Sequence, residues 1–180
     1  AYASVSPAER RRLHERFAAW VELSGNRDTT DDELLGYHLE RAYIDGSECA
    51  PASQREQLHR LACRAGHALA SAGRRAYVRG DARAAETLLS RAWRLLPEDD
   101  PTKLTLAPDL ADALAQRGRW EDAVDRLDGA SAAARRAGDR SVELRSHVVR
   151  LRVGLLHGRT SIADAQRELE ALLPALERHA

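Results

Sequence analysis

Apolar residues recur every three or four positions along most of the chain, with charged and polar residues between them. This spacing is typical of amphipathic α-helices, and no segment of useful length alternates apolar and polar residues with period two. Capping signals divide the pattern, as where Ser6 and Glu9 form a capping box around Pro7. The pattern predicts an all-α chain of about eight antiparallel helices, near residues 7–24, 31–45, 54–79, 82–96, 103–117, 120–137, 141–157 and 161–178.

The same spacing predicts which side chains face the core. Leu13, Phe17, Trp20 and Val21 would form the buried face of the first helix. The long third helix carries an apolar stripe at Leu58, Leu61, Ala65, Leu69, Ala72 and Ala76. Gly73 interrupts this helix. Because an interior glycine costs roughly 1 kcal/mol relative to alanine, Gly73 predicts the close approach of another helix.

An internal repeat relates the middle helices. When Gly80 is aligned with Gly118, small and apolar positions of the two flanking helix pairs agree at an offset of 38 residues. The aligned pairs are Gly73 with Ala111, Ala85 with Ala123, Leu89 with Leu127, and Ala92 with Ala130. This offset equals the 34-residue tetratricopeptide period plus an insertion near residues 98–101.

The repeated positions resemble the tetratricopeptide consensus. The first repeat covers residues 66–99, where Pro97 ends the second helix, and the second repeat covers 104–137. A degenerate third covers about 146–179, where Ala165 and Leu169 fit the pattern. The resemblance implies a tetratricopeptide-like array of helical hairpins, an α-solenoid, and a degenerate last repeat suits a capping role. A generic helical bundle is the alternative, because alanine- and leucine-rich helices can match such positions by chance.

A second resemblance covers most of the chain. The residues that carry it are 1–20, 33–43, 72–76, 79–81 and 95–97. They are similar to the region that follows the P-loop ATPase in large bacterial signal-transduction regulators of the nucleotide-cyclase and transcription-activator types. The resemblance implies an N-terminal helical pair over 1–50 after a missing upstream domain, with repeats over 51–180. The chain has no methionine, and we interpret it as a piece of such a regulator.

Composition narrows the function. The 28 basic and 28 acidic residues cancel, so no net field draws the chain to nucleic acid or to an anionic membrane. No apolar run approaches the roughly 20 residues that cross a bilayer. Cys49 and Cys63 form no C-x-x-C pair. A disulfide between them is one alternative, and a reduced, cytoplasmic setting is the simpler expectation.

Candidate chemistry is sparse. His59, Cys63 and His67 lie four residues apart, which places them on one helical face where a metal could find ligands. Three ligands on one straight helix climb roughly 12 Å, too far for a single tetrahedral ion, so we predict no metal site. The other histidines and the serines stand in no catalytic motif, and no G-x-x-x-x-G-K-[ST] loop is present. We therefore predict a chain without catalytic residues or a cofactor.

The tetratricopeptide resemblance also implies a binding surface, since the first helix of each pair lines the concave side of such arrays. The residues to which it points are His67, Arg74, Tyr77, Asp112, Gln116, His147, Arg150 and His157. An arginine-containing groove suits an acidic or extended peptide. We therefore expect a protein or peptide partner, among which the resemblance includes the ATPase domain of the same regulator.

Two other kinds of association follow from the same sequence. A helical nucleic-acid-binding domain is the alternative function, based on residues 10–12 and on Arg74, Arg75, Arg79 and Arg83. Acidic neighbours such as Glu9 and Asp81 dilute both arginine groups. The ends of a helical array expose apolar surface, which would let the chain pair with a copy of itself as a homodimer.

Overall fold

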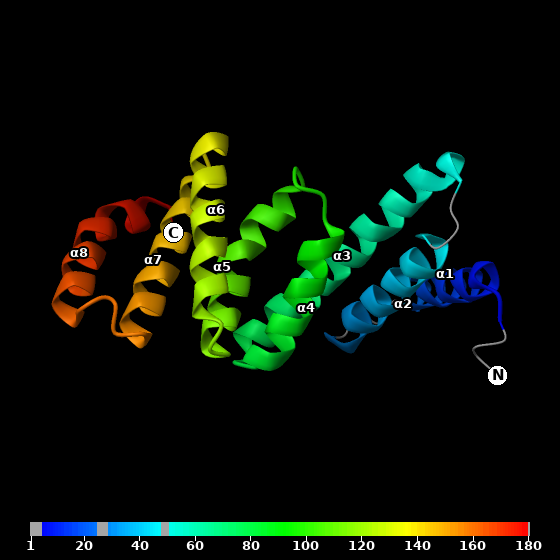
Figure 1. Cartoon of the computed structure of the whole chain (residues 1–180), viewed down its shortest axis with the longest axis horizontal. Coiled ribbons are helices and arrows are strands. Elements are labelled where there is room, and N and C mark those ends of the chain that lie inside the picture. The colour runs from blue at the N-terminus through cyan, green and yellow to red at the C-terminus, as the bar shows by residue number, and fades with distance from the viewer. Residues whose placement is uncertain (1–4, 25–28, 48–50, 180) are drawn as a thin grey trace.

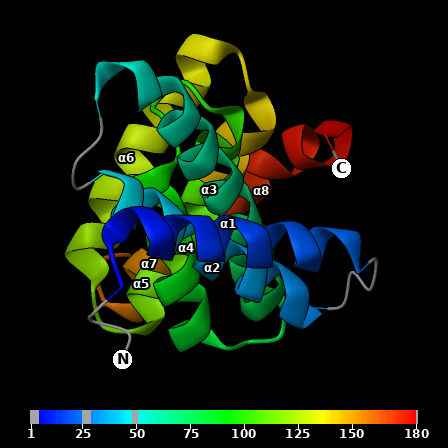
Figure 2. The same cartoon turned by 90° about the vertical axis from the view of Figure 1, so that its right-hand side faces the viewer.

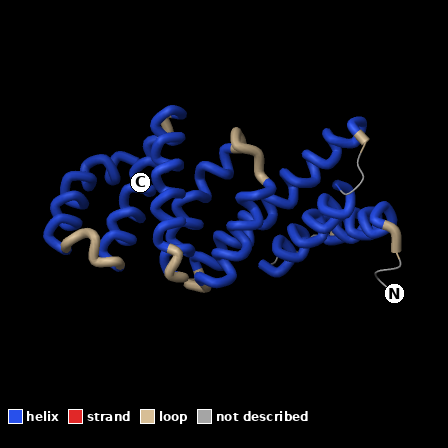
Figure 3. Tube along the Cα trace, in the orientation of Figure 1, coloured by secondary structure: helices blue, strands red, loops and turns tan. Residues whose placement is uncertain are grey.

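The computed structural model describes residues 5–24, 29–47 and 51–179. Within these ranges the chain forms eight α-helices and one short 3₁₀ helix, with no strand (Figures 1 and 3). The helices are α1 Pro7–Leu23, α2 Thr29–Ser47, α3 Arg55–Val78, α4 Ala82–Leu95, α5 Pro101–Gln116, α6 Trp120–Ala137, α7 Arg140–Leu156 and α8 Ile162–His179. The 3₁₀ helix η2, Ala52–Gln54, precedes α3. The prediction of an all-α chain is confirmed.

Capping residues explain where the helices begin. The Ser6 hydroxyl accepts a hydrogen bond from the Glu9 N–H at the start of α1, and the Glu9 carboxylate accepts one from the Ser6 N–H. α5 begins at Pro101, two residues before the predicted start. Asp100 caps this helix by accepting from the Thr102 N–H at 2.8 Å. Pro101 therefore occupies the first turn of a helix, where its missing N–H costs nothing.

The buried face of α1 differs from the predicted one. Val21 is buried as predicted, but Leu13, Phe17 and Trp20 are exposed, and Ala18 is buried in their place. Ala18 is fully buried in a cluster with residues of α2 and α3. A small side chain at the contact lets two helices approach closely, whereas the predicted aromatic face would hold α1 further from α2. Leu13 and Trp20 are left largely exposed to solvent.

Two hydrophobic clusters share the long helix α3. One joins its N-terminal half to α1 and α2, through residues that include Leu39, Leu58 and Leu61. The other joins its C-terminal half to α4–α7, through residues that include Leu89 and Leu110. α3 is therefore the element on which both the N-terminal pair and the first repeat pack.

Close packing at Gly73 is confirmed. A Cβ atom added to Gly73 would lie 2.7 Å from Leu89 Cδ2 and 3.1 Å from the Leu89 backbone nitrogen. Gly66 meets Leu96 and Gly36 meets Leu69 at the same 2.7 Å. Side chains at these positions would push neighbouring helices apart, so the glycines allow the short distances between α2, α3 and α4.

The helices stack as successive hairpins. α3 pairs with α4, α5 with α6, and α7 with α8, while α5 lies against both α3 and α7. The N-terminal pair α1–α2 lies at one end of the array and α8 at the other (Figures 1 and 2). The architecture is that of a tetratricopeptide-like helical array.

The third hairpin has a longer turn than the first two. Gly80, Gly118 and Gly158 each adopt positive φ and each donate the same backbone hydrogen bond, to the residue three positions earlier. They are spaced by 38 and then 40 residues. The residues that open the second helices, Asp81, Arg119 and Ser161, are spaced by 38 and then 42 residues. Two extra residues therefore lie within the α7–α8 turn.

Candidate protein-binding surface

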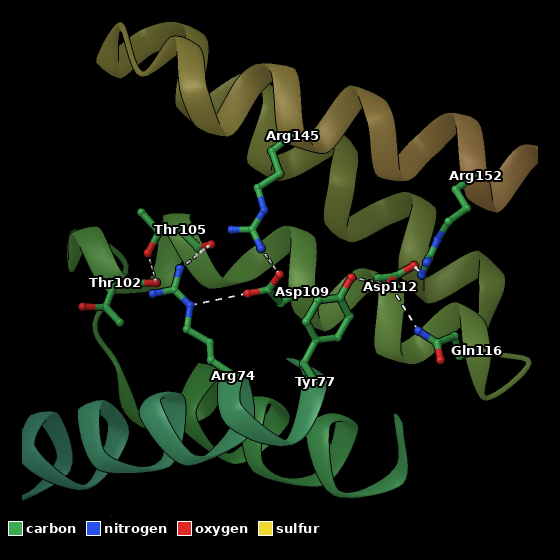
Figure 4. A network of polar contacts seen from close by, with 9 residues as sticks. All are labelled: Arg74, Tyr77, Thr102, Thr105, Asp109, Asp112, Gln116, Arg145 and Arg152. Carbon is green, nitrogen blue, oxygen red and sulfur yellow. Dashed lines mark hydrogen bonds and ion pairs between the residues drawn. The ribbon is translucent and has the colours of Figure 1, made fainter. Parts of the chain in front are cut away.

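A polar network runs across the first helices of the three hairpins (Figure 4). At its centre, the Asp109 carboxylate of α5 pairs with Arg74 of α3 at 3.4 Å and with Arg145 of α7. Arg74 also donates a hydrogen bond to the Thr105 carbonyl oxygen at 3.3 Å. One buried carboxylate thus joins two guanidinium groups from neighbouring repeats.

Asp112 forms a second node one turn further along α5. Its carboxylate accepts hydrogen bonds from the Tyr77 hydroxyl at 2.6 Å and from the Gln116 side-chain amide at 3.2 Å. Arg152 of α7 forms an ion pair with it. We refer to Arg74, Tyr77, Asp109, Asp112, Gln116, Arg145 and Arg152 together as the α3–α5–α7 face.

Charge is separated by depth on this face. The side chains of Asp109 and Asp112 are 4% and 0% exposed. Those of Arg74, Arg145 and Arg152 are 42%, 45% and 47% exposed. The buried carboxylates therefore orient the arginines from the protein side. The groups that this face presents to solvent or to a ligand are the N–H donors of the guanidinium groups.

A cavity of about 650 Å³ lies between α1, α2 and α3 and connects to this face through a smaller hollow that Arg74 also lines. Its lining combines the apolar side chains of Val21 and Leu39 with charged groups at the rim. Arg75 of α3 pairs with Asp32 of α2 at 2.7 Å across this rim. The smaller hollow, of about 460 Å³, is lined by residues of α3 and by Thr102. Apolar side chains of an extended ligand would fit here beside the arginines.

His67 lies at this hollow and points to the start of α5. Its Nε2 atom is 2.9 Å from the Asp100 carboxylate, the residue that caps α5. Burial opposes ionisation of Asp100, but hydrogen bonds from Thr102 and His67 hold its pKa below the ordinary value. The contact fixes the loop between the first two repeats against α3.

The structure brings four of the eight residues expected at the binding surface into one network, namely Arg74, Tyr77, Asp112 and Gln116. His67 lies beside them on α3.

The three expected residues of α7 lie elsewhere. His147 pairs with Glu168 of α8, Arg150 with Asp128 of α6, and the His157 ring lies 5.2 Å from the Trp120 ring.

The longer α7–α8 turn explains this difference. An alignment of the third repeat through Ala165, which follows the two extra residues, places α7 two positions out of register. Aligned through Gly158, the equivalents of His67 and Arg74 are Arg145 and Arg152. These arginines, with Asp109, are the members of the network that sequence reasoning missed. Gly158 was the sequence feature from which these two arginines could have been predicted.

The candidate metal ligands do not converge. Cys63 Sγ lies 3.6 Å from His59 Nε2, but His67 turns to Asp100 instead. Burial raises the pKa of the Cys63 thiol, and nearby carboxylates add to the shift. Within the described residues, no group of three or more His, Cys, Asp or Glu side chains could hold a metal ion. Cys49, the other cysteine, lies outside the described residues.

His14 and His38 meet between α1 and α2, a contact that the sequence does not predict. His14 Nδ1 and His38 Nδ1 are 2.8 Å apart, and the Phe17 ring stacks on His38 at 4.1 Å. Burial lowers the pKa of His14, and the His38 ring adds to this shift. Burial likewise lowers the pKa of His38. A hydrogen bond between two ring nitrogens requires one of them to accept, so this contact requires at least one of the two rings to be neutral.

The arginines of the two basic groups differ in their surroundings. Arg10 bonds to the buried Asp45 carboxylate, and Arg11 to Glu15. Arg12 is exposed. In the second group Arg74 and Arg75 pair with Asp109 and Asp32, while Arg79 and Arg83 are exposed.

The comparisons with known proteins agree with this architecture. Residues 78–144 match the family model described as Tetratricopeptide repeat. This stretch, well under half of the chain, is similar to a tetratricopeptide repeat. The match spans α4, α5, α6 and the start of α7. No curated protein and no solved structure matches the chain.

Tetratricopeptide repeats generally mediate protein–protein interactions, and their fold is typically a non-catalytic interaction module. Among the described residues, no helix has the length and apolar character needed to cross a membrane.

Proposed function

We propose that this chain binds an acidic segment of a protein partner along its α3–α5–α7 face. The observation that carries the proposal is the separation of charge by depth, with half-exposed arginines above buried aspartates. A guanidinium group has five N–H donors, so each arginine can keep its internal ion pair and still donate to a ligand carboxylate or carbonyl oxygen.

The charges of the network support an acidic ligand. Three arginines share two carboxylates, which leaves a net positive charge on the face. The adjoining cavity offers apolar contacts next to these donors. A peptide that combines acidic and apolar side chains would use both features, whereas a basic peptide would bring its charge next to guanidinium groups.

The resemblance to regulatory ATPases supports a finer proposal. In that setting the partner is the ATPase domain of the same regulator, held by the repeat region through an acidic surface. The chain would then transmit a signal by releasing or retaining that domain. An isolated ATPase domain should compete with an acidic peptide for the α3–α5–α7 face.

Fluorescence anisotropy can test the binding proposal directly. The probe is a short fluorescein-labelled peptide that alternates Glu and Leu, compared with its counterpart in which Lys replaces Glu. We expect the acidic peptide alone to bind, with an affinity that decreases as salt increases. Arg74→Gln should weaken binding about tenfold, as expected for the loss of one charge-assisted contact.

Arg94→Gln is the matched control, since Arg94 is exposed on α4, outside the proposed face. It should leave the affinity unchanged. Equal binding of both peptides, or equal weakening by both substitutions, would overturn the proposal. Strong salt-dependent binding of a single-stranded DNA oligonucleotide, with none of the acidic peptide, would instead favour the nucleic-acid alternative.

A further inference from the structure

A cavity of about 550 Å³ lies between the first two repeats. Its lining comes from the end of α4, the loop between α4 and α5, the start of α5 and most of α6. The hairpins on both sides of it have their neighbours, since α2 packs against α3 and α7 packs against α6. The cavity therefore lies inside the array and belongs to neither of its ends.

The sequence of α6 explains why this space is open. At the repeat offset of 38 residues, Gly129 of α6 corresponds to Arg91 of α4, and a small Ala133 corresponds to Leu95 in the same way. Arg91 bonds to Glu40 of α2 at 2.8 Å, and Leu95 packs against the buried core. A Cβ atom added to Gly129 would meet nothing within 4 Å. The small residues of α6 therefore leave a space that larger side chains fill one repeat earlier.

Arg126 brings a cationic group to this space. It corresponds to Leu88 of α4, which is 4% exposed, so Arg126 occupies a position that is buried in the first repeat. Its Cζ atom lies 4.2 Å from the centre of the Trp93 ring, and its Nε atom is buried without a hydrogen-bond partner among the described residues. Burial lowers the pKa of the guanidinium group, although nearby carboxylates oppose this shift. The cation has therefore lost part of its hydration.

Arg126 lacks the carboxylate that other shielded arginines have. Arg10 pairs with Asp45 at 2.9 Å, and Arg91 pairs with Glu40. Within the part of the chain that the structure describes, Arg126 forms neither an ion pair nor a hydrogen bond. Stacking on a ring leaves the N–H donors in the guanidinium plane available. An anion that enters the cavity would supply the missing counter-charge.

The other charged groups of the lining restrict the kind of anion. Lys103 is already paired with Glu98 at 2.7 Å, and Asp100 caps α5. Three further charged side chains are exposed at the rim, namely Asp99, Asp125 and Arg136. Solvent screens these rim charges from a single anionic group held at Arg126. Because aspartates outnumber arginine at the rim, they would repel the further charges of a polyanion. The lining therefore suits a ligand with one negative charge.

Apolar groups make up most of the remaining lining. Trp93 and Leu104 contribute large apolar side chains, and Ala130 and Ala133 contribute small ones. The volume lies within the roughly 300–1,000 Å³ of small-molecule sites, which are mostly apolar with a few polar groups that orient the ligand. A molecule with a carboxylate at one end and an apolar body at the other would use both features.

We propose that this cavity binds a small organic monocarboxylate, whose carboxylate pairs with Arg126 while its apolar body lies against Trp93 and Leu104. The site goes beyond the proposed function, because it shares no residue with the α3–α5–α7 face. For a ligand of about a dozen heavy atoms, we expect a dissociation constant on the order of 0.1–1 mM.

Proton–nitrogen correlation NMR can test the proposal. The chain has three tryptophans, so the spectrum contains three indole N–H signals, and Trp93→Phe identifies that of Trp93. The probe is 4-phenylbutyrate, added to about 10 mM, well above the expected dissociation constant. It should shift the Trp93 signal until saturation and leave those of Trp20 and Trp120 in place. Its uncharged counterpart, 4-phenylbutyramide, should bind about tenfold more weakly.

Substitutions on α6 separate the charge from the space. Arg126→Gln should weaken binding of 4-phenylbutyrate about tenfold and leave that of the amide unchanged, so that the two probes bind alike. Arg135→Gln is the matched control, since Arg135 is exposed on the same helix outside the lining, and it should change neither affinity. Gly129→Leu should abolish binding of both probes by filling the cavity. Leucine has a higher helix propensity than glycine, so this variant should keep its fold.

Three results would overturn the proposal. One is equal affinity of the wild type for the carboxylate and the amide, which would leave no role for the Arg126 charge. Another is equal weakening of 4-phenylbutyrate binding by Arg126→Gln and Arg135→Gln. The third is a Trp93 signal that does not respond to 4-phenylbutyrate, or that responds equally in Gly129→Leu.

Discussion

Gly73→Ala and Gly129→Ala make the same chemical change at two sites, and we expect them to have opposite effects on the stability of the fold. Both glycines lie inside helices, Gly73 in α3 and Gly129 in α6. An added Cβ at Gly73 would meet Leu89 at 2.7 Å, whereas at Gly129 it would meet nothing within 4 Å. Helix propensity favours alanine by roughly 1 kcal/mol at both sites, so any difference measures the cost of separating α3 from α4.

The structure sets the expected size of that cost. Overpacking a core by one carbon typically costs about 1–3 kcal/mol. Relief by side-chain rotation is limited at Gly73, because the Leu89 backbone nitrogen would lie only 3.1 Å from the new methyl group. The backbone contact therefore places the cost in the upper part of that range, about 2–3 kcal/mol, and subtracting the propensity gain of about 1 kcal/mol leaves Gly73→Ala roughly 1–2 kcal/mol less stable than wild type. Gly129→Ala should stabilise it by about 0.5–1 kcal/mol.

Urea and thermal unfolding followed by circular dichroism would measure both effects. For a chain of this size, 1 kcal/mol corresponds to a change in Tm of roughly 2–4 °C. The double variant Gly73→Ala/Leu89→Val should cost less than the sum of its single substitutions, since the shorter side chain makes room for the methyl group. A Gly73→Ala protein as stable as wild type would refute the close-packing argument, and so would a destabilised Gly129→Ala protein.

Three further predictions concern buried polar groups. The pKa values of His14 and His38 are lowered in the fold, so the stability that the two neutral rings contribute is complete above the unfolded pKa of about 6.5 and is lost as pH falls through the folded pKa values. The Tm of the wild type should therefore decrease from pH 7.5 to pH 5. The Tm of His14→Gln should decrease less over the same range. Asp112→Asn should lower the free energy of urea unfolding by about 1–3 kcal/mol, since it weakens several hydrogen bonds to a fully buried carboxylate. Lys103→Met should cost about 1–2 kcal/mol in the same assay, because the buried ammonium group donates to the Leu96 carbonyl oxygen at 3.1 Å.

Helix positions could be predicted from the sequence because the signals that begin and end these helices are local. Gly80 and Gly118 adopt φ near +80°, a conformation that side-chain-bearing residues rarely take, so they mark the turns directly. α6 begins at Trp120 and ends at Ala137, as predicted. Periodicity and turn residues are thus sufficient to predict the bounds of a helix where local sequence determines them.

The buried face of α1 could not be predicted in the same way. Periodicity identifies an apolar face, but it does not say whether a large or a small face meets the neighbouring helix. Here Ala18 faces α2, and Trp20, about 160° round the helix from Ala18 at 100° per residue, remains exposed. Only the packing of α1 against α2 and α3 determines that choice.

Prediction of the binding surface from the sequence was limited by the register of the third repeat and by the unknown burial of its aspartates. Gly158 and Ala165 give different alignments of the third repeat, and the sequence alone does not show that the extra residues lie in the turn. The role of Asp112 was also hidden. A carboxylate that contacts a partner and one that joins neighbouring repeats can occupy the same helical position, and only its complete burial distinguishes them.

Burial of the aspartates changes what the arginines above them can do. A free arginine loses side-chain entropy when a ligand immobilises it. Arg74 and Arg145 are already held by Asp109, and Arg152 by Asp112, so much of that loss occurs on folding. The same ion pairs draw the guanidinium charge partly inward and reduce the attraction for an acidic ligand. Binding should therefore gain more from orientation than from net charge, and replacing Arg74 by lysine, which keeps the charge but loses the planar fork, should weaken binding nearly as much as Arg74→Gln.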